Sequence, residues 1–555
     1  MLSTTKPLYL AALLFVLSVA VLLPGIGEIT SITGKDEYLL SMRTPLHMIE
    51  GDHGWLPWLD GEARLRKPPL IYWLGKVSYE TFGVSLVSAR SIGVLFAALL
   101  VFTTALIAWQ IGRNRHYMLL AGLIMLGSAG IMIDGRRMML DIPVAAFSAL
   151  SVLFFIMWWQ TGRGWHVIAS FVAMALGFLV KGPVALIFAG AGMLALTLSD
   201  ATMRQRLVTQ WPWLVAALIA FMLVALPWFA WLYTQYPQEL LNTLGEEVAA
   251  RNLADISLDP VFSLIIMTLP WSPVLIALLV RRDVPEREQD SWPGQKRFLI
   301  LWLVLSLLPF LFFKSFGRYL YGCLVPLALM AACMSFRMEC MQRYRAWFRT
   351  GMVIAVLVGL IFILGVLWFR GFAPIMLLPI GLTALFIVLW WRADRLIIMA
   401  LAAVLYWSSI LSIVYPRLGI NAIPEGVVEA VNGESVVLFA GPQPALLPMV
   451  AGTGMRDTSR LYELPDDILY RCRGFLIFSP YKHFVTARRQ LAELGHTIDP
   501  MQRYRILSSR GSWVRFAHED ATREDWINAF RDRDLDSLGT DVILVRAIHH
   551  RCKNT

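Results

Sequence analysis

Two adjacent carboxylates, Asp36 and Glu37, follow the first apolar stretch of the chain, residues 8–23. A pair of acids can accept a proton, orient a hydroxyl group or hold a metal ion. The structural alternative is a helix start, because Asp is favoured as an N-cap and the residues from Tyr38 onward have a helix-like pattern. The local sequence leaves both interpretations open.

Asp141 and Lys181 stand at the edges of apolar stretches, where an ionisable group suggests a function. Asp141 precedes Ile142 and Pro143, so it either caps a helix or serves as an acceptor or metal-binding group. Lys181 is followed directly by Gly-Pro and a further apolar stretch, which leaves almost no loop to solvate it. An ammonium group so placed favours an anionic ligand in a cavity, and snorkelling to lipid headgroups is the alternative.

Further cations precede helix-like stretches. Arg66 and Lys67 come before two prolines, at a point where proline sets the helix start and free backbone N–H groups favour anions. We expect a phosphate to bind there, with snorkelling again as the alternative. Arg318, with Tyr319 and Tyr321 close behind it, repeats this arrangement at another helix start.

Glu247 and Arg251 are four residues apart, so on a helix they share a face as an ion pair worth about 0.2–0.5 kcal/mol. The spacing alone is explained by such a structural pair. Together with Lys67, Lys181 and Arg318, however, Arg251 adds a further cation. Several cations and isolated carboxylates on one side of a membrane predict a site that binds a lipid phosphate and does chemistry beside it.

Membrane helices must position these groups, because 57% of the 555 residues are hydrophobic and only 16% are charged. A water-soluble globule does not have this composition. Apolar runs of bilayer-spanning length predict thirteen transmembrane helices. The predicted ranges are 8–23, 86–110, 117–133, 141–159, 165–180, 183–198, 211–233, 261–280, 298–313, 319–336, 351–369, 374–391 and 396–415.

The distribution of Lys and Arg predicts the orientation, since basic residues in short loops remain on the cytoplasmic side. With a cytoplasmic N-terminus, the cytoplasmic loops are clearly the more basic ones, and an odd number of spans leaves the C-terminal region outside. The outer side then receives the amphipathic segment 24–85, the loop 234–260 and the tail. The net charge of +10 is explained by this topology, so nucleic acid is not an expected partner.

The tail beyond residue 415 is polar and alternates strand-like runs (435–440, 475–479 and 541–545) with helix-like runs (483–494 and 524–530). We therefore predict an all-α polytopic membrane domain at 1–415, which includes the juxtamembrane segment 24–85, and a small soluble α/β domain at 416–555. The five cysteines have no paired CxxC spacing, and we predict neither a disulfide framework nor a zinc site.

The order of these motifs resembles the GT-C glycosyltransferases of the protein O-mannosyltransferase group, and within it the bacterial lipid A aminoarabinose transferases. The resemblance covers residues 1–415. It is carried by Asp-Glu after the first span, Arg-Lys-Pro-Pro with Tyr-Trp, Leu-Asp at the fourth span, Val-Lys-Gly closing the fifth and Leu-Pro-Trp (269–271) in the eighth. Gly34-Lys35 before the acidic pair and Arg318-Tyr319-Leu320-Tyr321 depart from the pattern of those transferases.

The resemblance implies an inverting enzyme of the bacterial inner membrane that takes a sugar from undecaprenyl (polyprenyl) phosphate. Transfer would occur on the periplasmic face, where the C-terminal domain also lies, to lipid A or another envelope acceptor. No metal ion or other cofactor is then required. Carried over by position, the catalytic acids are Asp36, Asp141 and Glu37, the donor phosphate contacts Lys67, Arg251, Lys181, Arg318, Tyr319 and Tyr321, and Glu247 is a further site residue.

The alternative function is a lipid-linked sugar flippase or transporter, which also needs outward cations and aromatic residues at the interface. Such a protein more naturally has broken helices in paired halves and ionisable groups at mid-membrane. The sequence contains no internal repeat, and its charges gather at one predicted surface. These features favour the transferase.

Overall fold

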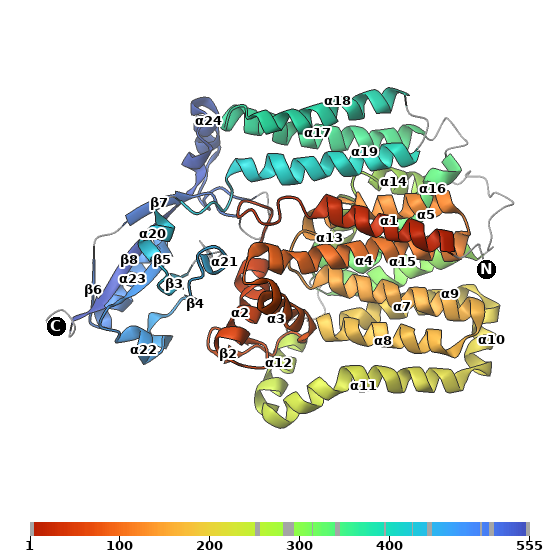
Figure 1. Cartoon of the computed structure of the whole chain (residues 1–555), viewed down its shortest axis with the longest axis horizontal. Coiled ribbons are helices and arrows are strands. Elements are labelled where there is room, and N and C mark those ends of the chain that lie inside the picture. Colours follow the sequence, from red (N-terminus) through yellow and green to blue (C-terminus); the bar gives the residue numbers. More distant parts are fainter. Residues whose placement is uncertain are drawn as a thin grey trace.

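The computed structural model describes residues 5–249, 256–280, 294–313, 315–338, 345–392, 396–424, 426–440, 447–499, 502–509 and 515–550. Most of them form a bundle of long helices, with the N-terminus at one end and a small sheet domain beyond the other (Figure 1). The helices of the bundle are α1 (Thr5–Leu22), α4 (Leu86–Gly112), α5 (Arg115–Leu126), α6 (Ala129–Asp134), α7 (Asp141–Thr161), α8 (Gly164–Lys181), α9 (Pro183–Ser199), α10 (Ala201–Thr209), α11 (Trp211–Gln235), α13 (Asp259–Met267), α14 (Ser272–Val280), α15 (Gln295–Phe312), α16 (Tyr321–Met338), α17 (Arg345–Phe369), α18 (Leu377–Arg392) and α19 (Leu396–Ser409).

Each predicted span coincides with a helix or with two consecutive helices of this bundle. The predicted span 117–133 is interrupted between α5 and α6, and the span 261–280 between α13 and α14. Within the described residues, seven helices are long and apolar enough to cross a membrane on their own, or eight if the bent pair α9–α10 is one span. The protein is therefore a multi-pass membrane protein, and the number thirteen stays a prediction.

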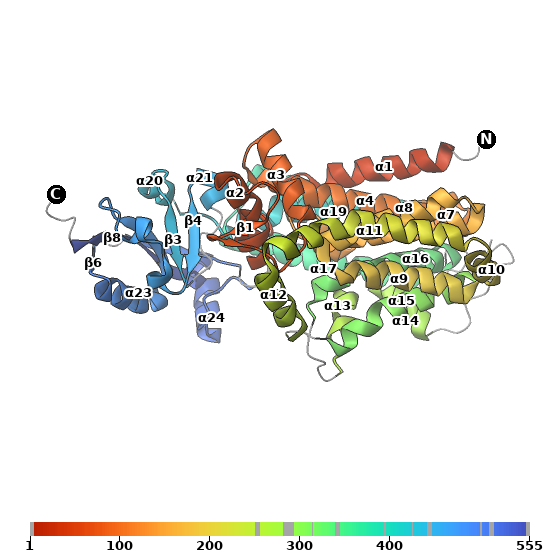
Figure 2. The ribbon, with the colours of Figure 1, turned by 90° about the horizontal axis from the view of Figure 1, so that it is seen from below.

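The bundle has central and peripheral helices. About two thirds of the apolar window of α4 (67%) and of α7 (72%) is buried inside the protein, whereas only 17% of the window of α11 is buried. Helices that are apolar all round but unburied must face lipid. The central helices α4 and α7 supply Arg90 and Asp141, while α11 lies on the outside of the bundle (Figure 2).

The juxtamembrane segment caps one end of the bundle. It contains a single π-helical turn (Glu37–Ser41), α2 (Arg43–Glu50), the antiparallel pair β1 (Trp58–Leu59) and β2 (Glu62–Ala63), and α3 (Leu70–Phe82). Helix α12 (Pro237–Ala249), which follows α11, lies at the same end (Figure 1). The predicted outer region 24–85 and the part 237–249 of the predicted outer loop 234–260 therefore come together there, opposite the N-terminus.

The C-terminal domain contains a mixed sheet in the order β4-β3-β5-β8-β6, with β7 also paired to β8. Strand β3 is parallel to β4 and β5, and β8 is antiparallel to β5, β6 and β7. The strands are β3 (Val436–Phe439), β4 (Met455–Thr458), β5 (Phe475–Pro480), β6 (His496–Ile498), β7 (Gln502–Ile506) and β8 (Thr540–His549); the helices are α20 (Val427–Val431), α21 (Leu447–Ala451), α22 (Asp466–Leu469), α23 (Tyr481–Glu493) and α24 (Arg523–Asp532). The predicted α/β tail is confirmed, including its three predicted strands and two predicted helices.

One cysteine prediction is wrong. Cys472, in the C-terminal domain, is disulfide-bonded, whereas Cys323 of α16 is a buried free thiol. The spacing of cysteines along the chain carries no information about pairing between distant positions, and only the fold supplies it. Disulfides persist in oxidising compartments and are rare in the bacterial cytosol.

Two sets of contacts join the tail to the membrane domain. At the end of α17, Trp368 stacks on Phe530 with ring centroids 4.8 Å apart, and Arg370, the first residue after the helix, forms an ion pair with Asp536 at 2.6 Å. On the juxtamembrane segment, the guanidinium of Arg43 donates to the carbonyl of Met455 at 2.9 Å. The tail is thus fixed at the end of the bundle where the predicted site residues gather.

Candidate functional site

Four charged side chains from distant parts of the chain form one continuous group of alternating sign. Arg318 donates to the carboxylate of Asp36, and its Nε lies 4.0 Å from Oδ2 of Asp141. Lys181 in turn donates to Asp141. Asp141 and Lys181 are nearly buried, with 5% and 8% of their side chains exposed, whereas Asp36 is 35% exposed. The acidic residue with access to a substrate is therefore Asp36.

The helices explain why these residues meet. Asp141 is the first residue of α7 and Lys181 is the last residue of α8, so the antiparallel packing of the two helices puts both at the same end. Gly182 has a positive φ of 62°, which a side chain would resist, and Pro183 starts α9 directly after it. Arg318 lies in the short 3₁₀ helix Gly317–Leu320 that leads into α16. Each charge is thus placed by a helix end.

The two tyrosines beside Arg318 have different roles. The ring of Tyr319 faces Lys181, whose Nζ lies 3.7 Å from the ring centroid, so Tyr319 contributes a cation–π contact to the cluster. Tyr321 is 2% exposed, and its hydroxyl donates to Oδ2 of Asp134 at 2.7 Å and to the carbonyl of Gly130 at 3.0 Å. Its ring borders the site, but its hydroxyl is engaged in the protein.

Lys67 and Glu247 meet across the site entrance. Nζ of Lys67 lies 2.8 Å from Oε1 of Glu247, and both side chains are about one quarter exposed. Lys67 also lines a small cavity together with Asp36, Asp141, Lys181 and Arg318. Of the predicted site residues, Arg251 lies outside the described part of the chain, and with it the predicted Glu247–Arg251 pair.

The catalytic role assigned to Glu37 stays a prediction, and the burial of its side chain argues against direct contact with a substrate, because none of the side chain is exposed. Oε2 accepts hydrogen bonds from the hydroxyl of Thr33 at 2.6 Å and from Nε of Arg137 at 3.3 Å. Oε1 accepts from Nε of Arg90 at 3.2 Å and from the backbone N–H of Met138 at 3.0 Å. These four hydrogen bonds tie Glu37 to Thr33, Arg90, Arg137 and Met138, and so hold the segment that carries Asp36.

Arg137 links Glu37 to the rest of the site. Its Nη1 donates to Oδ1 of Asp134 at 2.6 Å, and its Nε donates to Glu37. Burial alone would lower the pKa of Arg137, but Asp134 and Glu37 raise it above its ordinary value, so the guanidinium stays charged. Two carboxylates are therefore held by one buried cation behind Asp36.

Two cavities share the Asp36–Arg318 pair. The small one, of about 60 Å³, has Lys67, Asp141, Lys181 and Tyr319 in its wall, as well as Arg64 and Tyr72. The larger one, of about 480 Å³, is lined by Lys35, Asp134, Arg137, Phe316 and Tyr321, among others. Because both walls include Asp36 and Arg318, this ion pair stands between two spaces that different molecules could occupy.

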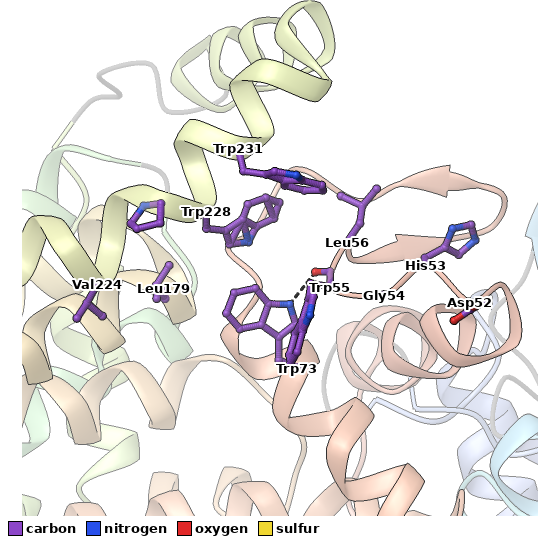
Figure 3. Close-up of a pocket in the computed structure, with 11 residues that line it drawn as sticks. Asp52, His53, Gly54, Trp55, Leu56, Trp73, Leu179, Val224, Trp228 and Trp231 are labelled. Carbon is purple, nitrogen blue, oxygen red and sulfur yellow. Dashed lines mark hydrogen bonds between the residues drawn. The ribbon is translucent and has the colours of Figure 1, made fainter.

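A third, apolar cavity of about 740 Å³ lies between the C-terminal parts of α8 and α11 and the juxtamembrane segment (Figure 3), and Leu179 in its wall is two residues before Lys181. The indole rings of Trp55, Trp73, Trp228 and Trp231 form much of its wall. Trp73 is fixed by a hydrogen bond from its Nε1 to the carbonyl of Trp55 at 2.7 Å. Indoles favour the headgroup depth of a membrane, so this cavity offers an apolar surface next to the cations.

The sequence interpretation missed Arg90, which holds Glu37, and Arg64, whose Nε donates to the hydroxyl of Tyr72 at 3.1 Å. Arg90 had a detectable signal, because it is a charged residue inside a predicted transmembrane span. Arg64 had none that distinguishes it from other juxtamembrane cations. Within the described residues, no group of three or more His, Cys, Asp or Glu side chains is arranged to hold a metal ion.

Comparison with known proteins points to one group. The sequence profile of the dolichyl-phosphate-mannose-protein mannosyltransferase family matches residues 53–241. The chain is 29% identical over 317 residues to undecaprenyl phosphate-alpha-4-amino-4-deoxy-L-arabinose arabinosyl transferase 1 of Sodalis glossinidius, over 54% of each chain. It is 25% identical to the protein of the same name from Proteus mirabilis, over 50% of each chain. The match thus spans about half the length of these curated relatives.

The fold is similar over a much longer range. The crystal structure of ArnT from Cupriavidus metallidurans bound to undecaprenyl phosphate superposes with a TM-score of 0.67 at 15% sequence identity, covering 96% of this chain and 97% of that one. The apo structure of the same protein gives the same TM-score. The resemblance predicted from the order of the motifs is thereby confirmed: the chain is similar in sequence to aminoarabinose transferases and has the GT-C fold of ArnT.

Proposed function

We propose that the protein is an inverting glycosyltransferase that moves a sugar from polyprenyl phosphate to an acceptor at the outer face of the membrane. The observation that carries the proposal is the single cavity that brings Asp36 and Asp141 together with Lys67, Lys181 and Arg318. The names of the similar proteins suggest undecaprenyl phosphate as the carrier and 4-amino-4-deoxy-L-arabinose as the sugar. The apolar, tryptophan-lined cavity beside the charges suits a lipid-linked substrate.

The donor phosphate binds on the side of Lys67 and Lys181. When the bond between the anomeric carbon and the phosphate oxygen breaks, its electron pair leaves with the phosphate. The fixed charges of Lys67, Lys181 and Arg318 stabilise this developing negative charge, and Arg251 is the further cation that the sequence assigns to the same task. Side-chain cations alone meet the charge, so the proposed reaction needs no metal ion and proceeds in the presence of EDTA.

The acceptor enters through the larger cavity, on the other side of the Asp36–Arg318 pair. Lys35, Arg137 and Arg318 in its wall favour an anionic group, such as a phosphate of lipid A. An ionised phosphate oxygen attacks without losing a proton, and Asp36 then orients this oxygen or the amino group of the sugar. With a hydroxyl acceptor, Asp36 takes the proton instead. A single displacement inverts the anomeric carbon in either case.

The outer face is assigned to the periplasm of a bacterial inner membrane. The site and the C-terminal domain lie at the end of the bundle opposite the N-terminus (Figure 1). The basic loops favour a cytoplasmic N-terminus, and the disulfide at Cys472 suits an oxidising compartment. A flippase is not favoured, because Asp141 and Lys181 occupy helix ends at one surface instead of the middle of the bundle.

The test is mass spectrometry of envelope lipids from cells that carry the wild-type gene, no gene or the Asp36→Asn variant. We expect a sugar-modified lipid with the wild type and a loss of about 100-fold or more with Asp36→Asn, the size of a lost acid–base or orienting group. Asp532→Asn is the matched control, because this carboxylate, on the last residue of the tail helix α24, is 58% exposed and lines none of the three cavities. An unchanged lipid profile in Asp36→Asn would remove Asp36 from the reaction.

A further inference from the structure

The turn that carries Asp36 is held at both of its ends by one residue of the C-terminal domain, Ser509. At the start of the turn, the hydroxyl of Ser509 shares its proton between the carbonyl of Thr33 at 3.3 Å and Oδ1 of Asn421 at 3.2 Å. At its end, the hydroxyl of Tyr38 donates to the carbonyl of Ser509, also at 3.3 Å. Within the turn, the backbone N–H of Glu37 donates to the carbonyl of Gly34 at 2.9 Å. Asp36 therefore lies on a closed turn whose two ends meet the tail.

Asn421 fixes Ser509 in the required orientation. Its Oδ1 accepts from the backbone N–H of Ser509 at 2.9 Å, and its Nδ2 donates to the hydroxyl of Ser509, also at 2.9 Å. The backbone of Asn421 has a positive φ of 64°, which Asn tolerates better than most residues do. Ser509, Asn421, Thr33 and Tyr38 are all at most 4% exposed. Hydrogen bonds in so dry a place hold their partners firmly.

These bonds are separate from the contacts that dock the tail on the bundle. The stacking of Trp368 on Phe530 and the ion pair of Arg370 with Asp536 join α17 to the end of α24 and the turn after it. Neither pair touches the turn 33–38. Removing the bonds of Ser509 thus leaves docking contacts in place, and removing Asp536 leaves the turn in place.

We propose that Ser509 and Asn421 are positioning residues of the active site: the C-terminal domain holds the turn 33–38 so that Asp36 faces the reacting carbon. The proposal rests on the transferase function stated above. Displacing a catalytic group by about 1 Å costs on the order of 100-fold in rate. Thr33 also donates to Glu37, so the same turn is pinned from the tail and from the buried Arg90 network. This assigns the tail a part in the reaction itself.

The test uses purified full-length protein and three variants: Ser509→Ala, Tyr38→Phe and the double variant Ser509→Ala/Tyr38→Phe. Asp536→Ala is the control. Ser509→Ala removes the bond to Thr33, and Tyr38→Phe removes the bond to the Ser509 carbonyl. We expect kcat to fall about 10-fold in each single variant and about 100-fold in the double variant. KM for the donor stays unchanged, because Lys67 and Lys181 are untouched. Asp536→Ala lowers the melting temperature and leaves kcat unchanged.

A second comparison separates positioning from general damage. If Ser509 acts through Asp36, then Ser509→Ala has no further effect on kcat in the Asp36→Asn background. An additive loss, or an unchanged kcat in the double variant Ser509→Ala/Tyr38→Phe, would overturn the proposal. Asn421→Gly, which keeps the left-handed backbone but loses the amide, should match Ser509→Ala.

Hydrogen exchange of the peptide 33–41 gives a readout that needs no activity. We expect faster exchange in Ser509→Ala and in Asn421→Gly, and wild-type exchange in Asp536→Ala. Equal exchange of this peptide in the wild type and in all variants would overturn the proposal that Ser509 holds the turn 33–38, even if activity changed. The two proposals can also fail separately. If the variants show the expected exchange pattern but the wild-type protein transfers no sugar, the proposed function is refuted and the contact between the tail and the turn 33–38 stands.

Discussion

Asp36 and Glu37 are chain neighbours with opposite surroundings. The carboxylate of Asp36 is about one third exposed and borders two cavities, whereas that of Glu37 is completely buried and accepts four hydrogen bonds. A buried charge that is paired and fully hydrogen-bonded costs little, but removing its charge leaves its partners uncompensated. The two acids should therefore respond in different ways to the loss of their charge.

We expect Glu37→Gln to destabilise the protein by about 3–5 kcal/mol, because it leaves the buried guanidinium of Arg90 and that of Arg137 without their shared carboxylate. Asp36→Asn should cost about 1 kcal/mol or less, since its partner Arg318 is one quarter exposed. Thermal unfolding in detergent measures both. A Glu37→Gln variant that melts like the wild type but transfers no sugar would restore the catalytic role that the burial of Glu37 argues against.

The sequence identifies which residue types form the site but not which of them reach the substrate. Asp36, Asp141, Lys67, Lys181 and Arg318 were predicted from helix ends in an apolar chain, and they line one cavity. The roles assigned to these residues stay predictions. Burial of Glu37 was not predictable, because its partners Arg90 and Arg137 lie 53 and 100 residues away and meet it only in the folded bundle.

At the scale of elements, two ion pairs that differ in solvent exposure join α12 to the residues just before α3. Glu247 pairs with Lys67 at 2.8 Å with both groups about one quarter exposed, and Glu246 pairs with Arg66 at 2.8 Å with both groups more than 60% exposed. Exposed pairs contribute little, so the first pair matters more. If Lys67 binds the donor phosphate as proposed, the carboxylate of Glu247 competes with that phosphate for Lys67.

We expect Glu247→Gln to raise the affinity for undecaprenyl phosphate about 3- to 10-fold, because Lys67 no longer has a carboxylate to give up. Glu246→Gln, one residue away, is the matched control and should leave the affinity unchanged. Titration of purified protein with undecaprenyl phosphate, followed by intrinsic tryptophan fluorescence, measures both. Weaker binding in Glu247→Gln would mean that this carboxylate helps to build the phosphate site.

The existence of the helices was predicted, and two interruptions were missed. Apolar runs locate the spans because a bilayer demands about twenty apolar residues for a helix, whatever the packing. The break between α5 and α6 falls at Gly127 and Ser128, and the break between α13 and α14 contains Pro270, so glycine and proline marked both positions in the sequence. In the tail, the strands β4, β6 and β7 escaped prediction because they are short and half polar, with exposed or partly exposed residues along most of their length.

At the scale of the whole molecule, the tail meets the juxtamembrane segment around His47. The backbone N–H of Asp60 donates to Nδ1 of His47 at 3.0 Å, so the ring must be neutral there. Burial and the nearby charge of Arg43 lower the pKa of His47 to about 4, with Arg456 adding to this effect and Asp60 opposing it. Arg456 itself donates to the carbonyl of Asp60 at 2.8 Å.

This contact should weaken in acid. The folded-state pKa of His47 lies below its unfolded value of 6.5, so its contribution to stability is complete above pH 6.5 and is lost as the pH falls toward 4. The loss is on the order of 1–3 kcal/mol. Raised pKa values of Glu50 and Asp457 act in the opposite direction over a similar range.

The difference between wild type and His47→Gln isolates the histidine from these carboxylates. We expect the melting temperature of the wild type to fall more steeply between pH 7 and pH 4.5 than that of His47→Gln, which keeps a polar side chain but does not titrate. Parallel curves for the two proteins would show that His47 does not titrate in this range.

The contacts of Ser509 with the turn 33–38 join two parts of the chain that are synthesised at different times. Thr33 and Ser509 are separated by 476 residues, so the turn 33–38 is synthesised long before the residue that holds it. Until the tail has folded, this turn lacks both contacts with Ser509. Under the proposed role of Ser509, we therefore expect a newly inserted protein to transfer sugar poorly until its tail has folded, although Asp36, Asp141, Lys181 and Arg318 are already in place.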